Sequence, residues 1–309
     1  MVDEIRGVWI HDSTCREMGG IQLAEECNRL GLNLLLPKVP WMSGPGADTQ
    51  YWREVMAPMI RRSHDLGMEV HAWIFFLNEA SVDNDGSLMQ VMESGKVEYA
   101  ACPASPETVR LNLEKIGPIL DEYELDGFNL EDNFVYHRWP QDPLICFCEY
   151  CRENAPEGFE ERMEWNRNHL TGLLESIAGE SRKHSSNLKI SAAARVPYET
   201  HAMPMSADWK EWCERGLVDY IAPMVYQREN GSLREMASNA MNLISHTGVP
   251  VYVGLGAYVL DRDLKGHDIP RQLEEQIGIV RELKADGHIH YHLGGLTLDQ
   301  SALIRKAYG

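Results

Sequence analysis

The chain has 309 residues, of which 44% are hydrophobic, so it is long enough to bury a large core. Its formal net charge of -18 argues against a nucleic-acid-binding protein, because a phosphate backbone requires a basic surface. This charge suits a neutral or cationic ligand. No apolar run reaches the ~18 residues that suggest a transmembrane helix, so we expect a soluble protein without a membrane partner.

The amino terminus and the cysteines bear on the cellular compartment. Residues 1–6 do not open a basic region followed by an apolar stretch, so no signal peptide is predicted. We therefore expect a cytoplasmic protein, or a secreted one if a leader was removed. Seven cysteines are an odd number, which does not favour a disulfide framework. The sequence does not fix the oligomeric state.

Strand and helix patterns alternate along the chain. Short apolar or alternating runs predict strands, and amphipathic runs, several of them ending at glycine, predict helices. The predicted strands cover 7–11, 33–37, 69–76, the stretch 125–133, 188–193, 219–225, 250–255 and 289–293. The predicted helices cover 21–30, 51–66, 107–123, 159–183, 208–215, 232–246, 270–285 and 298–307, and a long loop is predicted over 80–106.

This alternation predicts an α/β fold, a (β/α)8 TIM barrel, as a single domain over residues 1–309. The main alternative is an open doubly wound sheet. It is disfavoured because no glycine-rich phosphate loop follows the first strand.

The stretch 125–133 organises the functional prediction. Apolar and polar residues alternate from 128 to 131 with the two-residue period of a strand, after an Asp-Gly turn. Glu131, Asp132 and Asn133 follow at its carboxyl end, where acids are costly to desolvate and add little packing. In a barrel this end carries the chemistry. The alternative is a helix N-cap cluster, for which one Asp or Asn would suffice.

A series of short motifs runs in register along the chain. They are Arg6-Gly7-Val8-Trp9, His71-Ala72-Trp73, Asp126-Gly127, Arg138-Trp139-Pro140, the run from Cys146 to Arg152, Trp165-Asn166-Arg167, the run from Val218 to Tyr226, and the run from Val251 to Ala257. Together they resemble the barrels of glycosyl hydrolase-like family 10, from residue 6 to about residue 258. The resemblance implies a glycosidase barrel, without indicating its sugar.

There is also a weaker similarity to glycoside hydrolase family 18, the chitinase family. Its fourth-strand pattern Asp-Gly-x-Asp-x-Asp-x-Glu and its sixth-strand pattern Met-x-Tyr have counterparts here. The residues on which they fall are Asp126, Asn129, Glu131 and Asn133, and Met224 and Tyr226. Asn133 stands where that family has its acid, so its mechanism does not transfer directly.

Glu131 and Asp132 are the candidate catalytic residues. Glycoside hydrolysis normally needs a proton donor and a second carboxylate, ~5 Å apart for retention and ~6.5–9.5 Å apart for inversion. Glu131 is the candidate general acid, because we expect it to project into an aromatic barrel mouth where desolvation would raise its pKa. Asp132 is expected to point to the other side of the strand and to orient a neighbour or cap the loop.

The second carboxylate is not evident. The seventh strand runs into Gly254-Leu255-Gly256-Ala257, and the remaining candidates are Asp12, Glu79 and Glu199, each of which could equally be a surface acid. Three options stay open: inversion through a distant base, assistance by an acetamido group of the substrate, or no catalysis.

Polar and aromatic residues near strand ends are candidates for substrate binding. The predicted set is His11, Asp12, His71, Trp73, Asn78, Arg195, Tyr226, Tyr258 and His292. Trp9, Trp41, Trp73 and Trp139 could stack on sugar faces, with core packing as the alternative for Trp9 and Trp73. His290 and His292 share a face of the eighth strand and could bind a metal together with His71.

Four cysteines form a separate motif. Cys146, Cys148 and Cys151 are close in sequence, and Cys102 lies in the predicted loop at the same end of the barrel. They could meet around a structural zinc ion, or they could be buried thiols in a reducing compartment. No cofactor is expected to be required for activity.

Two functions are therefore open. The first is a glycoside hydrolase acting on a polysaccharide or glycoconjugate, with Glu131 as the acid. The second is a non-catalytic carbohydrate-binding barrel, a pseudoenzyme. A carboxylate within ~10 Å of Glu131 across the mouth would favour the first.

Overall fold

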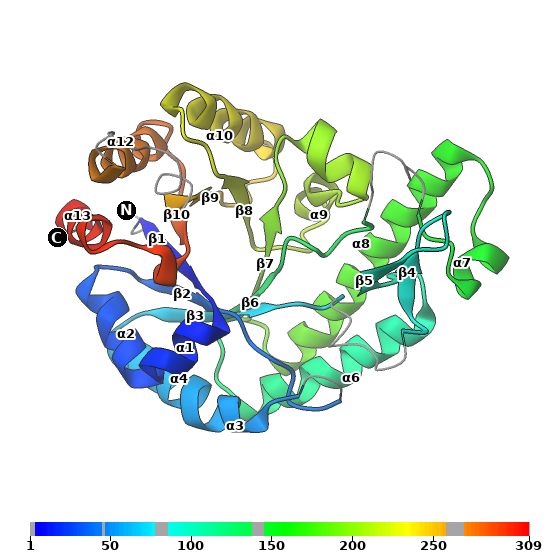
Figure 1. The fold of residues 1–309 in the computed structure, drawn as a ribbon, viewed down its shortest axis with the longest axis horizontal. Helices are drawn as coiled ribbons and strands as arrows, with labels where there is room; N and C mark the ends of the chain where they lie inside the picture. The colour runs from blue at the N-terminus through cyan, green and yellow to red at the C-terminus, as the bar shows by residue number, and fades with distance from the viewer. Residues whose placement is uncertain (1–3, 45–46, 78–85, 138–144, 258–268, 309) are drawn as a thin grey trace.

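The computed structural model describes residues 4–44, 47–77, 86–137, 145–257 and 269–308. Parallel strands close into a barrel in the order β1-β10-β9-β8-β7-β6-β3-β2, with helices around it (Figure 1). The strands are β1 (Ile5–Ile10), β2 (Leu34–Pro37), β3 (Glu69–Ile74), β6 (Gly127–Leu130), β7 (Lys189–Ala194), β8 (Tyr220–Val225), β9 (Tyr252–Leu255) and β10 (Gly287–Tyr291). Each overlaps one predicted strand, so the (β/α)8 TIM barrel is confirmed.

Helices follow the strands and cover the outside of the barrel. They are α1 (Asp12–Met18), α2 (Gly20–Arg29), α3 (Thr49–Tyr51), α4 (Ala57–Asp65), α6 (Pro106–Glu122), α7 (Glu149–Asn154), α8 (Phe159–His184), α9 (Trp209–Glu214), α10 (Asn230–Ile244), α12 (Ile269–Glu282) and α13 (Leu298–Tyr308). A π-helical segment, η1 (Trp52–Met56), joins α3 to α4. The prediction missed α1 and α7, since each is too short to show a clear helical period. Among the described helices, none has the length and apolar character needed to cross a membrane.

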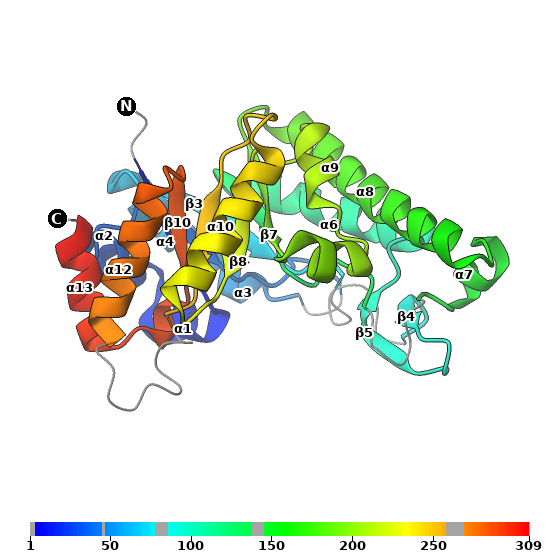
Figure 2. The same ribbon diagram turned by 90° about the horizontal axis from the view of Figure 1, so that it is seen from above.

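The segment predicted as a loop over 80–106 contains an antiparallel hairpin, which corrects that prediction. Its strands are β4 (Met89–Val91) and β5 (Val97–Ala101), and the turn between them uses Gly95 at φ +85°. A strand of three residues is too short to show alternation, which explains why the sequence did not indicate it. Figure 2 shows the hairpin on the same side of the molecule as α7, away from both termini.

The inside of the barrel combines large aromatic rings with a buried polar network. Trp9 Nε1 donates to Asn129 Oδ1 at 3.1 Å, and Asn129 Nδ2 donates to Ser191 Oγ at 2.9 Å. Asn129 and Ser191 are fully buried, so these hydrogen bonds satisfy polar groups that would otherwise destabilise the fold. The period-two prediction for β6 is confirmed here, because Asn129 faces the barrel while Phe128 packs outward on Phe76, with ring centroids 5.6 Å apart.

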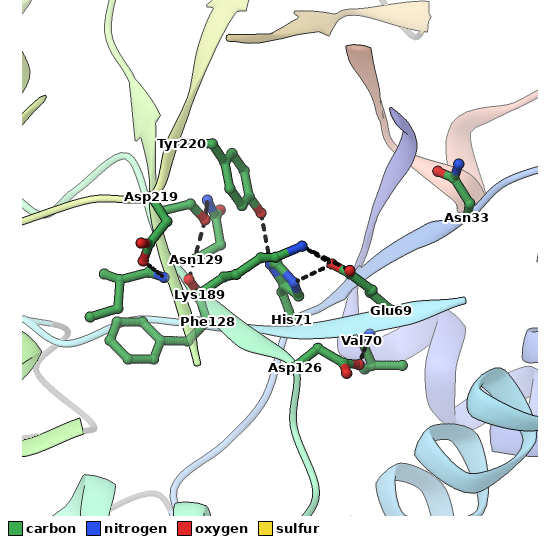
Figure 3. Close-up of polar contacts among 12 residues, drawn as sticks. Asn33, Glu69, Val70, His71, Asp126, Phe128, Asn129, Lys189, Asp219 and Tyr220 are labelled. Carbon is green, nitrogen blue, oxygen red and sulfur yellow. Dashed lines mark hydrogen bonds and ion pairs between the residues drawn. The ribbon is translucent and has the colours of Figure 1, made fainter. Parts of the chain in front are cut away.

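Asp126 and Gly127 support the start of β6. Asp126 Oδ2 accepts the backbone N–H of Val70 at 2.8 Å, which links the segment before β6 to β3 (Figure 3). A Cβ atom added at Gly127 would lie against the carbonyl oxygen of Lys189 and the ring of His71. Only glycine therefore allows β6 and β7 to approach this closely without a local shift.

Candidate active site

A pocket of about 340 Å³ opens at the carboxyl ends of the strands, and we call it the mouth pocket. The residues that line it are Trp9, Trp73, Asp132, Ala193, Arg195, Val196, His201, Met224, Tyr226 and Tyr291. They belong to β1, β3, β7, β8 and β10 and to the segments after β6, β7 and β8. Segments far apart in sequence thus converge where a TIM barrel places its chemistry.

Asp132 is held in the mouth pocket by Arg195. Arg195 Nε donates to the main-chain carbonyl of Asp132 at 2.8 Å, and another nitrogen of the guanidinium group lies 2.9 Å from Asp132 Oδ2. The same guanidinium group also donates to Asn133 Oδ1 at 3.3 Å. The carbonyl of Arg195 in turn accepts Trp209 Nε1 at 3.0 Å. A planar guanidinium that donates from two nitrogens fixes both the turn and the carboxylate.

Glu131 does not project into the mouth, which corrects the prediction for this residue. It is only 2% exposed and borders a small enclosed cavity beside Trp209 and Trp212. Burial, together with the neighbouring Asp132 carboxylate, raises the pKa of Glu131 well above its ordinary value. Its Oε2 accepts the backbone N–H of Asn133, and its Oε1 has no hydrogen-bond partner among the described residues.

Asp132 faces the mouth pocket in place of Glu131 because β6 ends just before these two residues. β6 stops at Leu130, and the backbone N–H of Phe134 donates to the carbonyl of Glu131 at 3.2 Å, which closes a turn. The alternation of side chains does not continue through a turn, so Asp132 faces the pocket and Glu131 lies behind it. The rise in the pKa of Glu131 was expected, but it comes from burial beneath the turn.

Aromatic rings form one wall of the mouth pocket. Tyr226 and Tyr291 stack with ring centroids 5.4 Å apart and an angle of 26° between their planes. Trp73 meets Tyr291 edge to face at 6.3 Å. Trp73 and Tyr226 therefore lie at the mouth, as predicted, and Trp9 contributes to its floor while being 1% exposed.

His11 and His292 lie together beside this wall. Their ring centroids are 4.5 Å apart, and His11 Nε2 lies 3.0 Å from the Tyr291 hydroxyl. Burial lowers the pKa of both rings, with Lys38 adding to the effect on His11 and His11 adding to the effect on His292. Neither ring lines the mouth pocket directly, so each supports the Tyr291 side of it.

His71 lies deeper, which corrects its predicted place among the substrate contacts. It is fully buried inside the barrel, where Nδ1 is 2.9 Å from the Tyr220 hydroxyl and Nε2 is 3.2 Å from Glu69 (Figure 3). Hydrogen bonding to His71, together with Lys189, lowers the pKa of Glu69 to about 2. His71 is thus part of the structural network of the barrel interior.

The three histidines considered as possible metal ligands, His71, His290 and His292, do not come together. His290 Nε2 lies 2.6 Å from the Tyr308 hydroxyl of α13, whereas His292 contacts His11 at the mouth and His71 contacts Tyr220. The three imidazoles therefore face different partners. Within the part of the chain that the structure describes, the metal-ligand side chains that gather closely are the four cysteines, Cys102, Cys146, Cys148 and Cys151.

Other predicted residues fall away from the pocket or outside the described ranges. Asp12 begins α1 and pairs with Arg16, Glu199 is exposed in the segment after β7, and Trp41 packs on Phe76. The predicted residues that lie outside the described part of the chain are Asn78, Glu79, Trp139 and Tyr258.

The sequence did not indicate five of the residues that line the pocket, which are Ala193, Val196, His201, Met224 and Tyr291. Tyr291 is the middle residue of the eighth predicted strand but the last residue of β10, so the predicted strand end lay two residues too far along the chain to indicate it. His201 lies in a π-helical turn, η2 (Tyr198–Ala202), after β7, which no pattern in the sequence signals.

Comparison with known proteins gives the family. The model of the family described as Glycosyl hydrolase-like 10 matches residues 43–268. The Bacillus subtilis (strain 168) protein "Glycosyl hydrolase YngK" is 21% identical over 325 residues, covering 90% of this chain and 63% of that protein. The Escherichia coli (strain K12) protein "Glycosyl hydrolase DigH" is 23% identical over 236 residues, covering 65% of this chain and 53% of that protein. The chain thus spans about half to two thirds of the length of these relatives.

Solved structures agree on the fold. The glycoside hydrolase domain of PgaB from Bordetella bronchiseptica superposes with a TM-score of 0.66 at 14% identity, covering 98% of both chains. At this identity the likeness establishes the fold alone. The resemblance read from the motifs is confirmed by the family match, and the chain belongs to the glycosyl hydrolase-like 10 family.

Proposed function

We propose that the protein hydrolyses glycosidic bonds of a polysaccharide or glycoconjugate in the mouth pocket, with Asp132 as the carboxyl group that acts on the bond. The observation that carries this proposal is the Asp132 carboxylate itself, which lines the pocket and is held by Arg195. Membership of the family and the names of its relatives support the reaction class.

The pocket has the chemistry that a sugar requires. The rings of Trp73, Tyr226 and Tyr291 offer apolar faces against which the C–H groups of a pyranose can pack. Arg195 and His201 add polar groups that can bind hydroxyl oxygens. A volume of about 340 Å³ lies at the lower end of the range for small-molecule sites, so we expect one or two sugar rings to be enclosed.

The general-acid role predicted for Glu131 passes in this proposal to Asp132. A proton donor must come within hydrogen-bond reach of the oxygen it protonates, and Glu131 is buried behind the turn. Glu131 acts instead as a positioning residue, because its Oε2 binds the N–H of Asn133 and so fixes the turn that presents Asp132.

The second catalytic role needs a group other than the described lining residues, since Asp132 is the one carboxylate among them. An acetamido group of the substrate is our first choice, because it can attack the anomeric carbon without a protein nucleophile. This choice predicts retention of anomeric configuration and a requirement for an N-acetyl group next to the scissile bond.

A panel of N-acetylated and de-N-acetylated glycans, with product detection by mass spectrometry, tests the proposal. Hydrolysis of N-acetylated glycans alone, with retention observed by NMR, would support it. Turnover of both sets would reject substrate assistance but keep the hydrolase. The presence of one carboxylate among the described lining residues also favours a second function, a carbohydrate-binding barrel without catalysis. Saturable glycan binding without any product would establish this function in place of hydrolysis.

A further inference from the structure

A second site lies beyond the barrel, where four cysteine side chains converge. The Sγ atoms of Cys102, Cys146, Cys148 and Cys151 all lie within 4.8 Å of one another, and all four residues are buried. We propose that these four thiolates bind a zinc ion that fastens the hairpin β4–β5 to the segment 145–151, which runs into the first turn of α7. Neither the observations that carry this site nor its test depends on the proposed glycosidase reaction.

The spacing of the sulfur atoms suits a tetrahedral metal. With Zn–S bonds of ~2.3 Å, tetrahedral geometry places neighbouring sulfur atoms ~3.8 Å apart. The Sγ atoms of Cys102 and Cys151 are 3.3 Å apart, which is far longer than a disulfide bond of ~2.05 Å. All four residues are free thiols in the structure, so no disulfide competes for them. This edge length of ~3.8 Å falls between the 3.3 Å that separates Cys102 from Cys151 and the 4.8 Å within which all four sulfur atoms lie, so small adjustments of the side chains would accommodate the ion.

The ligands come from two segments that the backbone already joins. Cys102 directly follows β5, and its N–H donates to the carbonyl of Leu88 at 2.7 Å. On the other segment, the N–H of Phe147 donates to the carbonyl of Val91 at 2.7 Å. The hairpin and the segment from 145 to 151 therefore pair edge to edge, and a metal would lock this pairing. Figure 1 shows β4, β5 and α7 gathered on one side of the barrel.

Groups around the cysteines fit a thiolate cluster. The N–H groups of Val91 and Cys148 both point at Cys146 Sγ, at 3.2 and 3.3 Å. Backbone N–H groups aimed at sulfur stabilise thiolate ligands and orient them. The buried guanidinium of Arg162 donates to the carbonyl of Cys146 at 2.9 Å, which places a positive charge beside a cluster that stays negative even with a divalent ion.

The choice of zinc follows from the donor set. Four thiolates in a closed, buried site favour zinc or iron over magnesium, calcium or copper(II), which prefer other ligands or geometries. A structural zinc site has all four positions filled by protein, as this one would. The ion would have no open position for substrate, so its role would be to stabilise the fold.

The site connects to the mouth through Gln90, a fully buried residue of β4. Its Nε2 donates to the carbonyls of Ala101 and Val135 at 3.0 Å each, and its Oε1 accepts the N–H of His137 at 2.9 Å. Val135 and His137 follow the turn that presents Asp132. A zinc ion that rigidifies the hairpin would therefore also restrain the segment that follows the turn carrying Asp132.

Metal analysis of the full chain, purified without added metal or chelator, tests this proposal. We expect about one zinc per chain by inductively coupled plasma mass spectrometry, and loss of most of it in Cys148→Ala. The matched control is Cys27→Ala, a buried cysteine of α2 outside the cluster, which should keep the full zinc content. Chelation under denaturing conditions should release the zinc and raise the count of reactive thiols by four.

A second measurement covers the case in which Cys148→Ala fails to fold. Wild-type protein refolded without metal should have a lower Tm that zinc restores, and cobalt should give the intense visible absorption of a tetrahedral thiolate site. Metal-free protein with four reactive cluster thiols and an unchanged Tm would overturn the site. Stoichiometric iron in place of zinc would overturn the choice of metal, and disulfide-linked peptides from the cluster would overturn the thiolate assignment. None of these outcomes depends on glycosidase activity.

Discussion

Arg195 binds Asp132 through two oxygens at once, the main-chain carbonyl at 2.8 Å and the carboxylate Oδ2 at 2.9 Å. The contact joins the end of β7 to the turn after β6, and it holds Asp132 on the mouth side of that turn. Asp132 is presented on the pocket side, while Glu131 lies beneath the turn.

Replacing Arg195 by lysine should weaken catalysis without unfolding the protein. A lysine ammonium cannot reproduce the two-nitrogen geometry, and hydrogen bonds to charged groups are worth ~1.5–3 kcal/mol, so kcat/KM should fall roughly 10- to 100-fold. The measurement is steady-state kinetics, with Arg182→Lys on the surface of α8 as the control. In the Asp132→Asn background the same change should add little, because the two side chains act as a unit. If the losses in kcat/KM from the two substitutions multiply in full in the double variant, Arg195 acts independently of Asp132.

Glu131→Gln should alter the pH dependence of the free energy of unfolding and should have only a small effect on turnover. The pKa of Glu131 is raised from 4.5 in the folded protein, so above pH 4.5 the folded state binds more protons than the unfolded state. Wild-type stability is therefore lost as the pH rises from 4.5 toward the raised pKa, and the amide variant should lack this loss. Urea denaturation from pH 4 to 9 measures it, with Glu199→Gln as an exposed control.

The kinetic part of this prediction separates the two acids. Turnover of Glu131→Gln should fall less than about tenfold, well short of the ~10²–10⁴ expected on removing a general acid. A loss in that larger range, with the fold intact, would return the acid role to Glu131.

His288 should make the protein sensitive to acid. Burial, with Arg281 and Arg6 adding to it, lowers the pKa of His288 from 6.5 to about 3. Between these values the unfolded chain binds the proton and the folded chain does not, so stability is lost as the pH falls below 6.5. His288→Gln should reduce the dependence of the free energy of unfolding on pH in denaturation experiments between pH 4 and 7. Part of the dependence should remain, because the pKa of neighbouring His290 is also lowered. An unchanged slope would contradict the assignment, and exposed His246→Gln is the control.

Two glycine-to-alanine substitutions with opposite expected effects on the free energy of unfolding test the packing of β6 against β7. Gly127→Ala would place a methyl group against the carbonyl of Lys189, and we expect a loss of ~1–3 kcal/mol in the free energy of unfolding. Gly172→Ala in α8 meets no atom within 4 Å, so alanine should stabilise the helix by ~0.5–1 kcal/mol. Equal effects at the two positions in thermal or chemical denaturation would show that the close strand approach does not constrain Gly127.

The sequence was sufficient for the barrel because each barrel strand is an apolar or alternating run and amphipathic helices alternate with these strands. It also located the acids after β6, since strand ends can be recognised without coordinates. It could not orient them, because the two-residue period stops at Leu130 and the turn geometry depends on Arg195, 63 residues further along the chain. The place of His71 was missed for a related reason: its partners Tyr220 and Glu69 are set by how strands close around the barrel axis. The sequence suggested the cysteine cluster because its two segments were predicted at one end of the barrel. It did not indicate the hairpin β4–β5, which Cys102 directly follows.

Turnover of Asp132→Asn tests the central claim most directly, measured on a glycan that the panel identifies as a substrate. Asparagine keeps the shape of the side chain but removes the carboxyl group, so kcat should fall ~10²–10⁴-fold while KM and the melting temperature change little. Asp12→Asn, an acid outside the pocket, should retain wild-type turnover. If Asp132→Asn keeps wild-type turnover on that glycan, the catalytic carboxyl group is elsewhere and the proposed site is wrong.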